Sequence, residues 1–180
     1  STLFPYTTLF RSTIDCIATD HAPHSAAEKS QGLRGSSSGI VGLETAFAVL
    51  YTGLVLAGSL SLECLVEKLC VNPRRIFGLP GGSLEAGAAA DIAVIDIHNE
   101  YEIEPASFYS KGRASPFAHW RTKAAVVLTL CGGKCVFKRN GLKGLSALDD
   151  FSFDGPAALQ PPVPFFYGME KGRKGSHTAE

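Results

Sequence analysis

The chain has 180 residues, and its 17 basic and 17 acidic residues cancel, so the formal net charge is zero. A neutral chain gives no electrostatic case for a nucleic-acid partner or for an anionic membrane surface. Hydrophobic residues make up 45% of the sequence and charged residues 19%, which excludes disorder over most of the chain and predicts one or two packed domains.

The cysteines are odd in number and lack the spacing of a disulfide framework; they are Cys16, Cys64, Cys70, Cys131 and Cys135. Free thiols fit a reducing compartment, so we expect a cytoplasmic protein. Cys131 and Cys135 allow two interpretations, a metal or redox pair and two strand residues beside a Gly-Gly turn. The second is favoured because no second cysteine pair exists. No apolar stretch is long enough to predict a membrane span.

The first segments of the chain differ in character. Residues 1–12 are expected to be extraneous, although Thr7 to Phe10 has the β-forming residues of a real strand. Ile14 to Ala18 is apolar and predicts a short buried strand, which Pro23 prevents from continuing.

Three ionisable residues, Asp20, His21 and His24, follow this predicted strand. The carboxyl end of a buried strand is where α/β barrels and open α/β sheets place their chemistry. A carboxylate there can bind a metal or move a proton. The alternatives are that Asp20 caps a turn, that His24 is a solvated loop residue and that His21 only packs.

The next segments predict a loop and three helices. Residues 25–42 are polar and rich in glycine, and we expect a loop of the kind that covers active sites. The apolar spacing over 43–55 predicts a helix, and Ser61 is a good N-cap for a second one. Asn72-Pro73 predicts the cap and first turn of a third, short helix that ends at Gly78.

The remaining segments predict β-structure and then a tail. The residues over 91–97, 124–130 and 134–138 favour strands, and Gly132-Gly133 predicts a hairpin between the last two. Prolines and polar residues over 141–180 predict a poorly ordered tail.

An ordered series of motifs resembles the type I dihydroorotases of the amidohydrolase superfamily. It begins with Thr19-Asp-His-Ala-Pro-His24 and covers roughly residues 13–140. The other motifs are Glu28-Lys29, Gln31-Gly32, Gly39-Ile-Val-Gly-Leu-Glu-Thr45, Asn72-Pro73, Ile76-Phe77-Gly78, Gly82-Ser-Leu-Glu85, Gly87, Ala90-Asp-Ile92, Ser110-Lys-Gly112 and Ser115-Pro-Phe117.

The resemblance implies an α/β fold, a C-terminal portion of a (β/α)₈ metal-dependent hydrolase barrel plus part of a small β-sandwich domain. Residues 13–78 would hold the last barrel strand, the active-site loop and barrel helices, and residues 79–140 the partial β-sandwich. A complete barrel takes about 250 residues, so we expect this chain to hold only part of one.

The resemblance also implies roles for individual residues. Asp20 would be a metal ligand and the catalytic base, and His24 would bind the carboxylate of the substrate. Ser38 and Gly39 would contact the substrate; related sequences often have Pro-Phe-Gly or Pro-Asn-Gly here, so the role of the Ser38 side chain is open. The alternative is that residues 37–39 form a flexible linker.

The implied reaction is the reversible hydrolysis of the cyclic amide of (S)-dihydroorotate to N-carbamoyl-L-aspartate in pyrimidine biosynthesis. The implied cofactor is zinc, held mostly by ligands outside this chain that include a His-x-His pair, so the fragment alone is expected to be inactive. The partner would be the small-molecule substrate, with a homo-oligomer or an association with aspartate transcarbamoylase left open. The alternatives are another cyclic amidohydrolase, such as an allantoinase or dihydropyrimidinase, and a non-catalytic scaffold protein.

Overall fold

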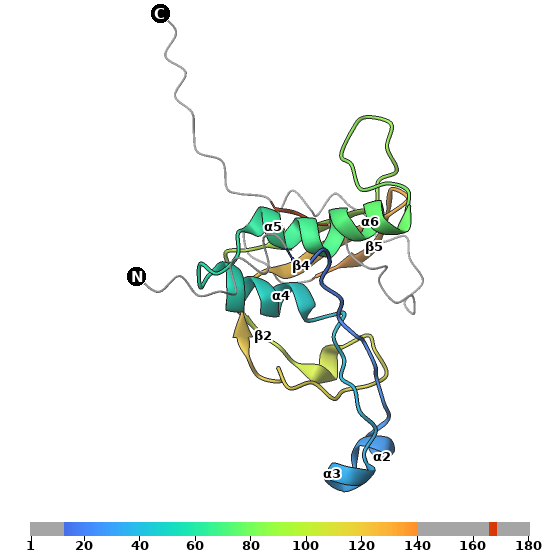
Figure 1. Ribbon diagram of the computed structural model, residues 1–180, viewed down its shortest axis with the longest axis vertical. Coiled ribbons are helices and arrows are strands. Elements are labelled where there is room, and N and C mark those ends of the chain that lie inside the picture. The colour runs from blue at the N-terminus through green and yellow to red at the C-terminus, as the bar shows by residue number, and fades with distance from the viewer. Residues whose placement is uncertain (1–12, 140–165, 169–180) are drawn as a thin grey trace, which may run out of the picture.

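The computed structural model describes residues 13–139 and 166–168. Helices pack over a sheet, and a long excursion of the chain carries two short helices, α2 and α3, away from this body (Figure 1). The expectations for residues 1–12 and for most of 141–180 lie outside the described residues. Within those residues no helix is long and apolar enough to cross a membrane.

The main sheet confirms the three predicted strands. Its order is β5-β4-β1-β6, where β1 is Ile92–Asp96, β4 is Ala125–Cys131, β5 is Lys134–Lys138 and β6 is Phe166–Gly168. Strand β4 lies antiparallel to both β1 and β5. The predicted Gly-Gly hairpin is also confirmed, because Gly132 and Gly133 adopt φ angles of 55° and 81°, which suit a tight hairpin turn.

Strand β6 corrects one expectation. Phe166–Gly168 pairs in parallel with Ala93–Ile95 of β1, so the prediction of a poorly ordered tail is wrong for these three residues. The sequence Phe-Tyr-Gly includes two good β-formers, and the edge of β1 offers unpaired backbone groups for them to bond.

The structure also contains a second, two-stranded sheet. It pairs β2 (Tyr101–Glu102) with β3 (Arg121–Thr122), and the 3-10 helix η3 (Pro105–Ser107) follows β2. Two exposed side-chain contacts support this sheet: the ion pair of Glu100 with Arg121 at 2.5 Å and the hydrogen bond between His119 Nδ1 and Glu102 Oε1 at 2.8 Å.

The helices begin and end close to the predicted positions. Helix α4 (Ala46–Leu50) continues as the π-helix η1 (Tyr51–Val55), which confirms the helix predicted over 43–55. Ser61 caps α5 (Leu62–Val66) by accepting a hydrogen bond from the Cys64 amide at 3.2 Å. Gly78 ends α6 (Asn72–Phe77) in the left-handed conformation, with φ 64°.

The predicted break at Asn72-Pro73 is wrong. Helix α5 runs through the π-helix η2 (Glu67–Val71) into α6 without interruption, and Asn72 is helical rather than a cap. Proline has no N–H, so a π-type turn cannot satisfy the carbonyl of Lys68 from Pro73. That carbonyl instead accepts a hydrogen bond from the Ile17 amide at 3.1 Å.

The strand predicted for Ile14 to Ala18 is also wrong. The segment lies outside both sheets, and its backbone bonds to the helix that contains Lys68 and Asn72. Besides the bond from Ile17, the buried Asn72 side chain donates to the Asp15 carbonyl at 2.9 Å. A strand requires a neighbouring strand, and the described residues supply none at this place.

The segment predicted as a loop, 25–42, contains two short helices. They are α2 (Ala26–Lys29) and α3 (Gly32–Gly35). Helix α2 begins with a capping box, in which Ser25 and Glu28 each bond the other's backbone amide.

The main core lies between the helices and the sheet. Phe47, Tyr51, Leu60 and Leu65 from the helical layer pack with Ile95 of β1 and Ala124. Ile92 and Val94 pack in a separate cluster with Leu128 and Leu130. The alternation along β1 therefore places apolar residues on both faces of the sheet. All five cysteines are free thiols; Cys131 is exposed while Cys135 is buried in that second cluster.

Gly53 offers a test of the helical assignment. It lies exposed in η1, and a Cβ added there would meet no atom within 4 Å. We expect Gly53→Ala to raise the free energy of unfolding by about 0.5–1 kcal/mol, because alanine loses less backbone entropy in a helix. Urea unfolding of the full chain measures this. Gly87→Ala is the control: the space is equally open but φ is 90°, so destabilisation is expected instead.

Asp96 ends β1 and organises the turn that follows. Its carboxylate accepts hydrogen bonds from the amides of His98 and Asn99 at 2.9 and 3.2 Å, and from the Asn99 side chain at 2.5 Å. Burial alone would raise the pKa of Asp96, but these hydrogen bonds bring the pKa below its ordinary value.

We expect Asp96→Ala to lower the free energy of unfolding by about 1–3 kcal/mol at neutral pH. Because the pKa is lowered in the folded state, this stabilisation is present above pH ~4 and is lost as the pH falls through the folded-state pKa. The difference in urea midpoint between wild type and variant should therefore be larger at pH 7 than at pH 3. Glu85→Ala, at an exposed carboxylate, should shift neither midpoint.

Candidate functional site

Two segments far apart in sequence run side by side and carry the predicted site residues. His21 and Ile40 form a parallel bridge, and the Ala22 amide donates to the Ile40 carbonyl at 3.0 Å. Both segments lead from the body of the molecule to the tip formed by α2 and α3 (Figure 1). Residues 20–24 and 38–42 are thereby brought together.

Asp20 is exposed and adopts a φ of 45°, in the left-handed region. Aspartate enters this region more readily than most residues, but the conformation still has an energetic cost, and such residues cluster at functional sites. Among the described residues the Asp20 carboxylate makes no hydrogen bond or ion pair. No amide of the described residues bonds this carboxylate, so nothing there supports the alternative in which Asp20 caps a turn.

His21 is occupied by the backbone. Its Nδ1 accepts hydrogen bonds from the amides of Gly42 and Leu43 at 3.1 and 3.3 Å, so a neutral ring carries its proton on Nε2. This agrees with a supporting role for His21 rather than metal ligation.

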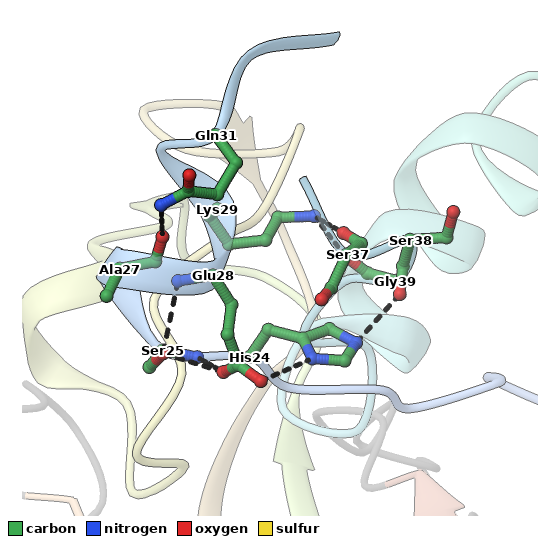
Figure 2. Close-up of polar contacts among 9 residues, drawn as sticks. All are labelled: His24, Ser25, Ala27, Glu28, Lys29, Gln31, Ser37, Ser38 and Gly39. Atoms are coloured by element: carbon green, nitrogen blue, oxygen red, sulfur yellow. Dashed lines mark hydrogen bonds and ion pairs between the residues drawn. The ribbon is translucent and has the colours of Figure 1, made fainter. Parts of the chain in front are cut away.

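The structure brings His24, Ser38 and Gly39 together (Figure 2). The His24 ring donates from Nε2 to the Ser38 carbonyl at 2.8 Å, and its Nδ1 lies 3.8 Å from Glu28 Oε1. The Ser38 hydroxyl points away from the imidazole, so the contact uses the backbone alone. Gly39, with φ 124°, has no room for a side chain: a Cβ would lie 2.6 Å from Ala22 Cβ and 3.3 Å from His24 Nε2.

Helix α2 supports this group, which the sequence analysis did not foresee. Glu28 Oε2 accepts hydrogen bonds from Ser25 Oγ at 2.6 Å and from the Ser25 amide at 2.8 Å. The Ser25 hydroxyl is the main reason that the pKa of Glu28 is lowered. The signal was available, since Ser-x-x-Glu is the spacing of a capping box.

Lys29 was also missed. Its ammonium donates to the carbonyls of Ser37 and Gly39, both at 2.8 Å (Figure 2). In turn its own carbonyl accepts from Ser36 Oγ at 2.8 Å. Glu28-Lys29 is one of the motifs of the resemblance, but neither that motif nor any periodicity indicates contacts of this kind, since a lysine in a polar segment is usually solvated.

Residues 108–114 form a backing for the two site segments. Glu44 accepts the amides of Tyr109 and Ser110 at 2.7 and 2.9 Å. Arg113 donates to the carbonyls of Phe108 and Ser110. Gly112 lies against Pro23, where a Cβ would come within 2.7 Å of the proline Cβ. The backbone at Gly112 therefore packs directly against Pro23 and His24.

The described residues do not make a zinc site by themselves. Within them no group of three histidine, cysteine, aspartate or glutamate side chains could hold a metal ion. His21 Nδ1 and His24 Nε2 already have backbone partners. Asp20 has no partner among the residues that the structure describes, but it is a single carboxylate, and catalytic zinc typically has three protein ligands.

Comparison with known proteins shows what this arrangement is similar to. Residues 9–136 match the family model described as "Amidohydrolase family". The matched range includes residues 9–12, which belong to the segment expected to be extraneous. The chain is 49% identical over 131 residues to a dihydroorotase of Bacillus cereus (strain B4264) and 50% identical over 131 residues to one of Geobacillus sp. (strain WCH70). Each match covers 73% of this chain and 31% of the relative, so the chain spans about a third of their length.

A solved structure agrees. The fold is similar to the L-hydantoinase (dihydropyrimidinase) of Arthrobacter aurescens with a TM-score of 0.68 and 32% identity, covering 76% of this chain and 32% of that one. The predicted α/β class, as part of a barrel hydrolase, is confirmed by this similarity and by the mixture of helices and strands. The chain belongs to the amidohydrolase family.

Proposed function

We propose that this chain is part of a dihydroorotase, which hydrolyses the cyclic amide of dihydroorotate reversibly to N-carbamoyl-L-aspartate. The observation that carries the proposal is the Asp20 carboxylate, which is exposed, has no partner among the described residues and lies in a strained backbone conformation beside the segment of His24. The degree of identity supports the substrate: the dihydroorotases match at 49–50%, the hydantoinase at 32%.

The roles proposed for the residues follow from their contacts. The Asp20 carboxylate has no partner among the described residues and would act as the base that takes a proton from the attacking water and returns it to the leaving nitrogen. His24 would bind the carboxylate of the substrate, with its ring oriented by the Ser38 carbonyl. Ser38 and Gly39 would contact the substrate through the backbone, since the Ser38 hydroxyl points away from the histidine.

Zinc is proposed as the cofactor, with Asp20 as one ligand and the others outside the described residues. Bound zinc would lower the pKa of a water molecule toward neutrality. Residues 13–78 would belong to the barrel and residues 79–140 to a β-sandwich. The complete enzyme would act in the cytoplasm. It would assemble either with copies of itself or with aspartate transcarbamoylase.

A second candidate is another cyclic amidohydrolase. The similarity in fold to an L-hydantoinase (dihydropyrimidinase) favours it specifically. The two candidates differ in substrate, since dihydroorotate carries a carboxylate that hydantoin and dihydrouracil lack. A site that pairs with this carboxylate should reject the analogues without it.

A composite enzyme tests the proposal. It is the Bacillus cereus dihydroorotase in which the segment that matches this chain is replaced by residues 13–139. We expect the zinc-loaded composite enzyme to hydrolyse dihydroorotate with a kcat/KM at least about a hundredfold above that for hydantoin or dihydrouracil. The chain alone, given zinc, should be inactive.

The controls separate misfolding from lack of function. The intact Bacillus enzyme is measured in parallel, and circular dichroism and bound zinc are compared between the two. A folded, zinc-loaded composite enzyme without turnover of dihydroorotate would overturn the proposal and favour a scaffold protein. A preference for hydantoin or dihydrouracil would favour the second candidate.

A further inference from the structure

Three consecutive carbonyl groups of the site loop, residues 37–39, are all bound by side chains from the opposite segment. Lys29 Nζ donates to the carbonyls of Ser37 and Gly39, and His24 Nε2 donates to that of Ser38, each at 2.8 Å. Figure 2 shows the lysine and the histidine reaching different carbonyls of this loop.

The loop conformation depends on contacts from outside it. Carbonyls two residues apart in an extended segment point to the same side, so the Lys29 ammonium can bind those of Ser37 and Gly39, and the Ser38 carbonyl between them is bound by His24. Gly39 has a φ of 124°, a value that side-chain-bearing residues rarely adopt. Two donors from one segment, residues 24–29, therefore hold all three carbonyls.

The charge of Lys29 is used for this purpose alone within the described part of the chain. Its ammonium has no ion pair there, and the neighbouring Glu28 carboxylate is bonded to Ser25 instead. Hydrogen bonds from a charged donor are stronger than neutral ones, and the half-buried position of Lys29 reduces their screening by solvent.

We propose that Lys29 is a positioning residue, which fixes residues 37–39 and through them the ring of His24 in the geometry that the substrate subsite needs. The link to substrate rests on the proposed function; the link to loop geometry does not. Lys29 would not touch the substrate, because its ammonium is directed at the carbonyls of Ser37 and Gly39.

Amide hydrogen exchange of the full 180-residue chain tests the geometry. Lys29→Met keeps the aliphatic stem and removes the donors, and it should speed exchange over residues 36–42 at least about tenfold. Exchange over helix residues 62–77 should not change. Lys29→Arg keeps a charged donor and should restore most of the protection.

Lys134→Met is the matched control, because Lys134 is exposed on β5 and its ammonium has no partner among the described residues. It should leave residues 36–42 as in wild type. Unchanged exchange of these residues in Lys29→Met would overturn the proposal. Faster exchange throughout the chain in Lys29→Met, with no recovery of protection in Lys29→Arg, would also overturn it. Such a result would show that Lys29 stabilises the whole fold and not this loop in particular.

Kinetics of the composite enzyme test the link to substrate. Lys29→Met should raise the KM for dihydroorotate about tenfold or more and leave kcat within about threefold, with Lys29→Arg close to wild type. An unchanged KM in an active composite enzyme whose loop exchanges faster would overturn the link. A composite enzyme that is inactive before any substitution counts against the proposed function, and hydrogen exchange still decides the role of Lys29.

Discussion

Asp20→Asn is expected to lower the kcat of the composite enzyme for dihydroorotate about a thousandfold or more. Asparagine has nearly the same shape and tolerates the left-handed φ of 45° found here. It cannot accept the proton that a general base takes, and this loss alone is worth about 10²–10⁴ in rate. Any share of the carboxylate in binding a metal ion would add to that loss.

Folding should be nearly unaffected by this substitution. The Asp20 side chain is exposed and has no hydrogen bond among the described residues, so the free energy of unfolding should change by less than about 0.5 kcal/mol. Steady-state kinetics and urea unfolding measure the two effects. Asp15→Asn is the matched control, an exposed aspartate close in sequence whose carboxylate has no partner among the described residues and whose backbone carbonyl accepts from Asn72. If Asp20→Asn kept more than about a tenth of the wild-type kcat, Asp20 could not be the base.

Gly39→Ala is expected to have the largest effect on the structure of the site. The added Cβ would lie 2.6 Å from Ala22 Cβ and 2.7 Å from the Ala22 carbonyl oxygen, and φ is 124°. Strain at such a φ costs about 1–3 kcal/mol, and overpacking against the backbone costs about as much again. We expect a loss of about 2–5 kcal/mol in unfolding free energy, or a displaced loop in which His24 no longer reaches the Ser38 carbonyl.

The control for Gly39→Ala measures the cost of a positive φ without a steric collision. Gly58 also has a positive φ, 72°, but a Cβ there meets nothing within 4 Å. Gly58→Ala should therefore cost only about 1–2 kcal/mol. Urea unfolding of both variants, together with the NMR shifts of the His24 ring, separates the cost of backbone strain from the cost of the overlap with Ala22. Equal destabilisation by the two substitutions would contradict the close approach of Gly39 to Ala22.

Local sequence patterns predicted the parts of the fold that depend on local physics. The strands β1, β4 and β5 and the Gly132-Gly133 turn follow from β-forming runs and from two residues that tolerate positive φ. The Ser61 cap and the end of α6 at Gly78 follow from hydrogen-bonding side chains and glycine. These features are decided within a few residues of the chain.

The wrong predictions concern distant partners. Ile14 to Ala18 has the composition of a strand, yet its backbone bonds to the helix that contains Lys68 and Asn72. Pro73 predicted a break, but the helix continues because another segment takes up the carbonyl that proline leaves free. Strand β6 depends on an open edge of β1, which no pattern within its own three residues reveals.

In the candidate site, too, the sequence indicated some residues, whereas others depend on contacts between distant segments. Asp20 and His24 are close in sequence and could be chosen from their chemistry alone. That His24, Ser38 and Gly39 lie together was implied by a resemblance, and the structure brings them into contact. Lys29 could not be chosen, because its bonds to Ser37 and Gly39 depend on how the chain returns past α2.

Sequencing the natural gene upstream of the part that encodes this chain tests most directly whether Asp20 completes a metal centre shared with another part of the same polypeptide. A reading frame that continues upstream and encodes a His-x-His pair after an apolar strand is the expected result. A frame that carries other residues in place of that pair, or that a stop codon closes before such a strand is reached, would contradict the metal centre proposed at Asp20.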